Sequence, residues 1–246
     1  MAHAITPTLD HAPHTHEASI GARFCGPPKS GTGGYAIGLV AKNFDCAVEI
    51  TLKRPLPLDR PMQVVTDGQT AGLFHEGHEL ASARATDLRL DLPTPITFQE
   101  AAAARAGFSG YRVHPFPNCF VCGTHRSCGD GMCLFTGETE EGVVASSWVP
   151  NEEFADEDGL VKPEFLGAAL DCPGAWALIG KYDITGPVVL GRMTYASYRP
   201  VDAGGRYVVM GWALGQEGRK SFCGTAIFDQ EGNVCAAAKA TWFQLK

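Results

Sequence analysis

The sequence predicts an α+β protein made of two related units, each a helix followed by an antiparallel meander of strands. Two observations carry this prediction: the composition, and an order of patterns that occurs twice along the chain. The 246 residues are 45% hydrophobic and 19% charged and include 29 glycines, which is typical of a compact fold rich in strands and turns. At about 100–200 residues per domain, the chain is long enough for one large domain or two small ones.

The first unit begins after residue 19. A short apolar segment at 22–25 and a Gly/Pro/Ser loop at 26–34 precede a predicted buried helix at 35–42. Pro- or Gly-containing turns then separate predicted strands at 47–53, 62–66, 70–74 and 79–90.

The second unit repeats this order after an Ala-rich connector at 93–107, which is predicted to be helical through 98–106. A helix is predicted at 163–178, with Pro163 in the favoured first turn and Glu164 complementing the helix dipole. The predicted strands are 132–136, 142–148, 192–198, 206–214, 221–228 and 234–244.

The repeat is also visible in the residues themselves. Segment 76–86 (EGHELASARAT) matches segment 231–241 (EGNVCAAAKAT) at a constant offset, with Arg84 in place of Lys239. Two copies of one supersecondary unit indicate a single pseudo-symmetric body. We therefore divide the chain into a tail (1–19), an N-terminal unit with its connector (20–110) and a C-terminal unit (111–246).

Charge and terminal composition exclude several function classes. With 20 Lys plus Arg against 27 Asp plus Glu, the net charge is -7, so the basic footprint of a nucleic-acid-binding protein is missing. No apolar run approaches the ~18 residues of a membrane span. Residues 1–19 are polar, rich in His and Pro, and unlike a secretory signal. We expect a disordered tail, a cytoplasmic location and reduced thiols.

Five ordered motifs resemble the double hotdog family, in particular its acyl-CoA thioesterase-like members. They span nearly the whole chain from residue 20, and they are 26–35 (GPPKSGTGGY), 54–61 (RPLPLDRP), 114–123 (HPFPNCFVCG), 168–174 (AALDCPG) and 218–220 (GRK). The resemblance implies a tandem hotdog fold, in which each unit is a long central helix wrapped by an antiparallel sheet.

Asp171 is the most informative acidic residue. It lies within an otherwise apolar predicted helix, where an unpaired carboxylate is costly. Pro173 cannot donate to the carbonyl of Ala169, so we expect a kink or break beside Asp171. In the resembled thioesterases, an aspartate at this place orients the attacking water. The alternative is a structural aspartate that is hydrogen-bonded to the loop at Gly26 or the loop at Gly123.

The expected catalytic partners of Asp171 lie at a helix start and on two strands. Gly33 and Gly34 mark the start of the first helix, whose free N–H groups could polarise a thioester carbonyl; a tight packing turn is the alternative. The hydroxyl and amide partners of the resembled family fall near Leu190 and Ala240, which cannot hydrogen-bond. Thr194 and Thr241 are the predicted substitutes, and Gln244 is a further one if the register slips.

Coenzyme A carries phosphates, which require local cations despite the acidic total. The predicted substrate-binding residues are Tyr35, Trp176, Arg199, Arg219 and Lys220, with Arg54 and Arg60 as further candidate cations.

Cysteines and histidines limit the other chemistries. The spacing Cys119-x2-Cys122-x5-Cys128-x4-Cys133 could hold zinc, but its second pair is irregular, so neither a metal nor a cofactor is expected. Cys172 would be a nucleophile only beside a base that lowers its pKa. All eight histidines lie at or before residue 125, which disfavours dehydratase-type acid/base pairs.

We therefore expect an acyl-CoA hydrolase in which Asp171 orients a water molecule and a helix N-terminus polarises the carbonyl. Its partner would be an acyl-CoA or acyl-carrier thioester, and a homodimer is expected from the resemblance. Two alternatives stay open: a non-catalytic acyl-CoA or acyl-carrier binding protein, and a biosynthetic enzyme acting on carrier-bound acyl intermediates.

Overall fold

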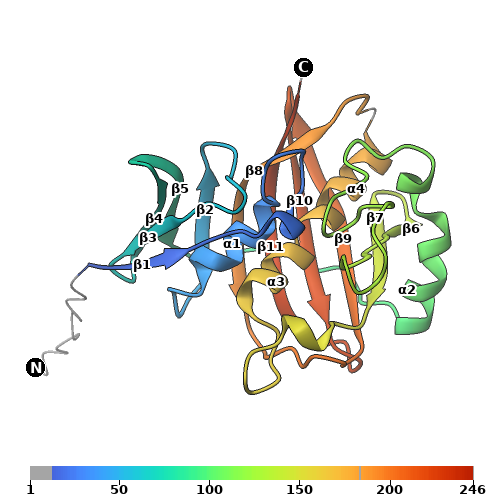
Figure 1. Ribbon diagram of the computed structural model, residues 1–246. Coiled ribbons are helices and arrows are strands. Elements are labelled where there is room, and N and C mark those ends of the chain that lie inside the picture. Colours follow the sequence, from blue (N-terminus) through green and yellow to red (C-terminus); the bar gives the residue numbers. More distant parts are fainter. Residues whose placement is uncertain (1–12, 183, 246) are drawn as a thin grey trace, which may run out of the picture.

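A computed structural model describes residues 13–182 and 184–245. Its strands belong to one 11-stranded sheet in which every pair is antiparallel (Figure 1). The strands are β1 (His14–Ala18), β2 (Val48–Leu52), β3 (Met62–Thr66), β4 (Thr70–His75), β5 (His78–Ala85), β6 (Gly137–Glu140), β7 (Val143–Trp148), β8 (Val188–Ser197), β9 (Tyr207–Glu217), β10 (Lys220–Phe228) and β11 (Val234–Gln244).

The β2–β8 pair joins the two halves of the sheet, with four further strands on one side and five on the other. One side continues as β5, β4, β3 and β1, and the other as β11, β10, β9, β7 and β6. The matching segments of the sequence repeat lie in β5 and β11 and the turns before them, the second strand out on each side. β2 and β8 pair from Val48↔Tyr195 to Thr51↔Arg192, so two halves distant in sequence share one continuous sheet.

Helices lie on both faces of this sheet, with three of the four α-helices on the same face (Figure 1). The α-helices are α1 (Gly33–Ala41), α2 (Phe98–Ala104), α3 (Pro163–Ala169) and α4 (Cys172–Lys181), and the short 3₁₀ segments are Ala22–Phe24, Arg105–Gly107, Ser109–Tyr111 and Glu152–Phe154. Every residue of α1 after Gly33 is buried, as expected for a helix that is apolar on all sides. α1 packs against α3, and α4 lies across β9 and β10. Within the described residues, no helix has the length and apolar character to cross a membrane.

Glycines allow α1 and α3 to approach to backbone contact. A Cβ atom built on Gly38 would overlap the carbonyl oxygen of Pro163, and one on Gly34 would overlap the carbonyl oxygen of Gly167. A Cβ on Gly167 would in turn overlap the backbone of Gly34. Since only glycine lacks this atom, these positions fix how closely the two helices pack.

The predicted break beside Asp171 is confirmed. α3 ends at Ala169, and Asp171, at φ -79° and ψ -81°, is the N-cap residue of α4. The carbonyl oxygen of Leu170 accepts a hydrogen bond from Thr225 Oγ1 at 2.9 Å. The break therefore leaves that buried carbonyl satisfied, as a buried helix end requires.

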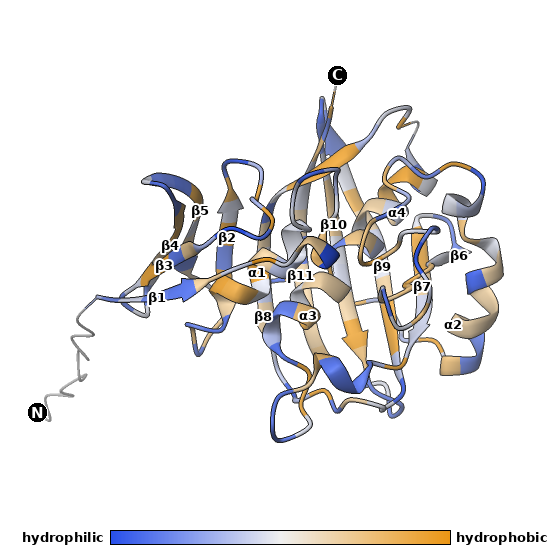
Figure 2. Ribbon diagram, in the orientation of Figure 1, coloured by the Kyte–Doolittle hydropathy of each residue, from blue (hydrophilic) through white to orange (hydrophobic). Residues whose placement is uncertain are grey.

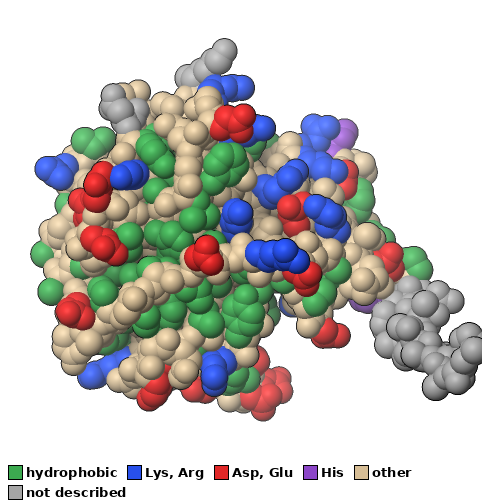
Figure 3. Space-filling model, turned by 180° about the vertical axis from the view of Figure 1, so that it is seen from behind, with side chains coloured by type: hydrophobic (Ala, Val, Ile, Leu, Met, Phe, Trp, Pro, Cys, Tyr) green, Lys and Arg blue, Asp and Glu red, His purple; other side chains and the backbone are tan. Residues whose placement is uncertain are grey.

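The connector covers the outer face of the sheet, opposite α4. Ala101 of α2, together with Leu88, Leu90 and Ile96, packs on a cluster that includes Met210 and Trp212 of β9. From this side the surface shows a band of hydrophobic side chains with charged side chains around it (Figure 3). The C-terminal half of the sheet thus has apolar cover on both faces.

Most predicted elements are confirmed with small shifts of their ends, but two predicted strand segments were wrong. Met132 and Leu134 are buried, yet Cys133 has φ 51° and interrupts any extended run. The N–H groups of Met132 and Leu134 instead donate hydrogen bonds to the carbonyl oxygens of Phe120 and Val121. Residues 86–90 lie outside β5, because the chain leaves the sheet there to cover its outer face.

The expected disordered tail was wrong for residues 14–18, whereas residues 1–12 lie outside the described part. His14–Ala18 form the edge strand β1, paired in register from His14↔Thr66 to Ala18↔Met62. The strand is hydrophilic (Figure 2), so it has no apolar period to reveal it. Its stability comes from backbone pairing along β3 and from the fully buried Ile20 just beyond it.

The contact between α1 and α3 predicts that Gly38→Ala destabilises the protein. The added methyl group meets backbone atoms that cannot rotate away, so the free energy of unfolding should fall by about 1–3 kcal/mol. Urea unfolding at constant m-value measures this change.

Gly180→Ala in α4 is the matched control, because nothing lies within 4 Å of a Cβ at that position. A helical glycine in open space should gain about 0.5–1 kcal/mol on this change. Equal effects of the two substitutions would contradict the close approach of α1 and α3.

Candidate functional site

Asp171 lies at the break between α3 and α4 and is held by the other half of the chain. Its Oδ2 accepts hydrogen bonds from Thr32 Oγ1 at 2.6 Å and from the backbone N–H of Gly34 at 2.7 Å. Thr32 is the N-cap residue of α1, and Gly34 lies in its first turn. The carboxylate therefore sits at the positive end of the α1 dipole.

The second carboxylate oxygen of Asp171 has no protein partner. Oδ1 is buried and accepts no hydrogen bond, while the whole residue is 3% exposed. Burial raises the pKa of Asp171 to about 6, against the opposing hydrogen bonds from Thr32 and Gly34. A buried acceptor without a donor is uncommon in folded proteins and calls for a specific reason.

Asp171 forms part of the wall of a cleft of about 680 Å³, a size typical of small-molecule sites. Loop 26–33 and residues 52–56 form one side, tied together by the Gly31 N–H···O Leu56 bond (2.9 Å). The first residues of β8, the end of β11 and the start of α4 form the other. The cleft thus lies between the two halves of the chain.

The cleft combines an apolar lining with a basic rim. Its apolar side chains include Leu52, Phe116, Leu190 and Trp242, and its cations are Lys29, Lys53 and Arg54. Lys53 is paired with Glu79 at 2.6 Å. An apolar chain with an anionic end fits this distribution of side chains.

Gly33 and Gly34 lie beside Asp171, as predicted, but they do different things. The Gly34 N–H already donates to Asp171, so it is not available to a substrate carbonyl, and its predicted polarising role was wrong. Gly33 lines the cleft, where a Cβ would come within 2.9 Å of Leu52 Cδ1 and 3.0 Å of Leu190 Cδ2. Its missing side chain keeps the helix start open to the cleft.

The prediction that Thr194 and Thr241 partner Asp171 was wrong. Each threonine lies between two residues that pack in the core on the helix side of the sheet. These neighbours are Met193 and Tyr195 for Thr194, and Ala240 and Trp242 for Thr241. Their side chains therefore point to the opposite face of the sheet. Of the positions expected to be polar, Leu190 lines the cleft and Ala240 is buried against the core.

Tyr35 and Trp176 are core residues rather than lining residues of this cleft, so their predicted contact with substrate was wrong. Tyr35 stacks on Phe24 with ring centroids 4.6 Å apart, and Trp176 meets Phe108 edge-on at 4.6 Å. Both are at most 7% exposed. Large aromatic residues on buried helices resemble binding residues in sequence, but here they fill space between layers.

Some of the predicted phosphate-binding cations lie at the cleft and others do not. Arg199 follows the far end of β8, about 25 Å of extended chain beyond the cleft-lining Gly191, so its assignment to this site was wrong. Arg219 and Lys220 lie next to the cleft. Lys220 pairs with Phe243, which lines the cleft, and the Arg219 carbonyl accepts a hydrogen bond from the N–H of the following residue, Gln244. Arg54 lines the cleft itself.

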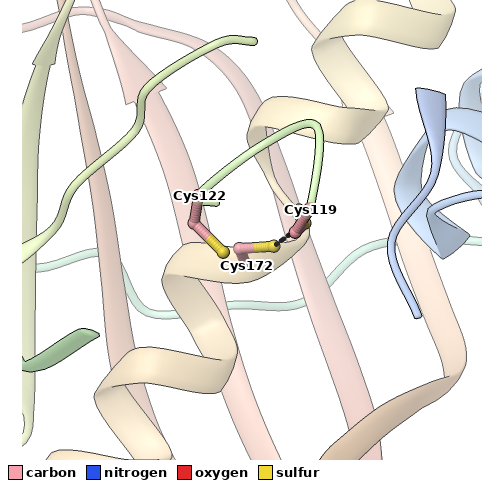
Figure 4. Close-up of side chains that lie close together, drawn as sticks. All are labelled: Cys119, Cys122 and Cys172. Carbon is pink, nitrogen blue, oxygen red and sulfur yellow. Dashed lines mark hydrogen bonds between the residues drawn. The ribbon is translucent and has the colours of Figure 1, made fainter. Parts of the chain in front are cut away.

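Three cysteines converge at the start of α4 (Figure 4), where Cys172 directly follows Asp171. The sulfur atoms of Cys119, Cys122 and Cys172 all lie within 4.8 Å of one another, and all three residues are buried. Cys119 and Cys172 also line the cleft. The sequence pattern had instead grouped Cys119 and Cys122 with Cys128, which is exposed, and Cys133, and the structure does not place those two in this cluster.

Thr32 is the site residue that sequence reasoning missed. A threonine directly before a Gly-Gly helix start is a typical N-cap, and this signal was available. Here, however, its hydroxyl donates to a carboxylate 139 positions away rather than capping its own helix. No local pattern contains that contact.

No protein-family model matches this sequence, and no curated protein sequence matches it.

Solved structures match the whole chain at low sequence identity. The tesB protein of Mycobacterium avium subspecies paratuberculosis is 12% identical with a TM-score of 0.63, covering 94% of this chain and 93% of that one. A candidate thioesterase II from Thermobifida fusca is 12% identical with a TM-score of 0.61, covering 94% and 92%. A protein of unknown function with the hot dog fold, from Alicyclobacillus acidocaldarius, is 10% identical with a TM-score of 0.60, covering 98% and 99%. The chain therefore has the hotdog fold.

Proposed function

We propose that this chain is a tandem pair of hotdog units (20–110 and 111–246) that hydrolyses acyl thioesters, with acyl-CoA as the substrate class. One active site lies in the cleft between the units and uses Asp171 to orient the attacking water. Full-length structural neighbours named as thioesterases support the reaction class. The sequence resemblance to acyl-CoA thioesterases points the same way.

The unpartnered Oδ1 of Asp171 carries this proposal. Oδ2 is anchored by two donors, so the carboxylate has a fixed orientation and one acceptor left. A water molecule donating to Oδ1 would be aligned for attack and could pass its proton to the carboxylate as it adds. Most carboxylates with a pKa of about 6 are ionised at neutral pH and can accept that proton.

The start of α1 polarises the thioester carbonyl in this reaction. With Gly34 committed to Asp171, the N–H of Gly33 is the helix-terminal donor in the lining of the cleft. A thioester carbonyl placed there would develop its negative charge against the positive helix end. The apolar wall formed by Leu52, Leu190 and Trp242 would hold the acyl chain.

Asp171→Asn tests the role of the carboxylate. Asparagine keeps an acceptor for Thr32 and Gly34 but cannot take a proton, so turnover should fall by about 10²–10⁴-fold. An acyl-CoA panel followed by mass spectrometry measures turnover without thiol reagents, which would react with the nine cysteines of the protein.

Asp158→Asn, at an exposed position, is the control and should leave turnover unchanged. Full activity in Asp171→Asn would contradict the mechanism. If the wild-type protein binds acyl-CoA but hydrolyses no thioester, a binding protein replaces the hydrolase.

Thr32→Val tests the positioning of Asp171. The substitution keeps the shape but removes the 2.6 Å hydrogen bond, so kcat should fall at least about tenfold while KM changes little. The free energy of unfolding should also fall by about 1–3 kcal/mol, since a buried acceptor loses a donor. Thr32→Ser restores the hydroxyl and should rescue kcat. Failure of this rescue would assign the Thr32 effect to packing.

Arg54→Ala tests recognition of the coenzyme. Loss of an exposed cation at the rim should raise KM for acyl-CoA about 2–5-fold, as expected for ~0.5–1 kcal/mol, and the effect should shrink at high salt. Thioesters of pantetheine lack the nucleotide phosphates and should show no change. Arg89→Ala, exposed and outside the cleft lining, is the control. An equal effect on both thioester classes would rule out phosphate recognition by Arg54.

A further inference from the structure

The cluster of Cys119, Cys122 and Cys172 joins two segments that are far apart in sequence. Cys119 and Cys122 lie in the loop before Gly123, and Cys172 is the first residue of α4 (Figure 4). The sulfur atoms of Cys119 and Cys172 are 3.6 Å apart, and all three sulfur atoms lie within 4.8 Å of one another. Within residues 13–182 and 184–245 this is the one such group of at least three His, Cys, Asp or Glu side chains.

These distances suit a shared metal ion. Sulfur ligands about 2.3 Å from a tetrahedral Zn²⁺ are roughly 3.8 Å from each other, so the three thiols need to move little. A disulfide needs sulfur atoms about 2.05 Å apart, which is a larger movement and would leave the third thiol over. The geometry thus favours a three-ligand site over a redox pair.

The loop that carries Cys119 and Cys122 is a tight turn, and Cys172 faces it from a helix start. The loop is closed by the Gly123 N–H···O Cys119 hydrogen bond of 2.9 Å. This Cys-x-x-Cys-Gly turn has the form of a zinc-binding knuckle. Cys172 lies at the N-terminus of the ten-residue helix α4, where the helix dipole would stabilise the negative charge of a metal-bound sulfur.

We propose that Cys119, Cys122 and Cys172 bind one thiophilic divalent cation, of which Zn²⁺ is the representative. Binding converts three thiols to thiolates and releases three protons, which leaves a net charge of -1 on the site. Cys119 and Cys172 line the cleft, so the fourth coordination position is reached from there by water or a small ligand. The cation takes no part in the hydrolysis step proposed for Asp171, although Cys172 directly follows that residue in the chain.

Co²⁺ titration of the intact protein tests this site. After treatment with a chelator and a reductant, the wild-type protein should bind one Co²⁺ per chain with a thiolate-to-metal charge-transfer band that Zn²⁺ abolishes. Cys119→Ser, Cys122→Ser and Cys172→Ser should each weaken binding at least about tenfold, since losing even an outer-shell partner costs ~10–100-fold. Cys46→Ser and Cys128→Ser alter exposed cysteines and should bind as the wild type does.

X-ray absorption of the Zn²⁺-loaded wild type gives a readout that needs no variant and no enzymatic activity. Three sulfur neighbours at about 2.3 Å are expected. Absence of the charge-transfer band, fewer than three sulfur neighbours, or a loss of binding in Cys128→Ser but not in Cys172→Ser would each overturn the proposal. Thioester hydrolysis without metal binding would reject this site and leave the proposed function standing.

Discussion

The close crossing of α1 and α3 is the constraint on which the site depends. Gly34 and Gly38 on one helix and Gly167 on the other remove the side chains that would hold the backbones apart. Only at this separation does the first turn of α1 reach the end of α3. The hydrogen bonds from Thr32 and Gly34 to Asp171 follow from the packing of backbones, not from long, adaptable side chains.

Burying the Asp171 carboxylate lowers the stability of the fold. A carboxylate buried to 3% exposure, with one oxygen lacking a donor, opposes folding, and its raised pKa records the same cost. The break between α3 and α4 also interrupts helical hydrogen bonding, although Thr225 satisfies the carbonyl of Leu170. Groups that destabilise a core at the wall of a cleft are typical of sites kept for binding or chemistry.

Sequence patterns predicted the elements well where the signal was local. Pro173 predicted the break in the helix, and the duplicated EG…T segments lie on strands placed symmetrically in the sheet. The failures came where tertiary contacts decide. β1 is held by its partner strand rather than by apolar residues, and the face on which Thr194 and Thr241 lie depends on strand register. The donors of Asp171 come from the other half of the chain, which one-dimensional spacing cannot show.

The break between α3 and α4 positions both Asp171 and Cys172 in the wall of the cleft. Because Asp171 is the N-cap of α4 and Cys172 its first residue, the break that turns the carboxylate toward Thr32 also turns the thiol toward Cys119 and Cys122. The position of this helix start is therefore set from two sides, by α1 through Asp171 and by loop 114–123 through the cysteines. A cation held by the three thiols would fix the first turn of α4 and, with it, the backbone that carries Asp171. Order at the cysteine cluster would thereby limit the freedom of the carboxylate in the wall of the cleft.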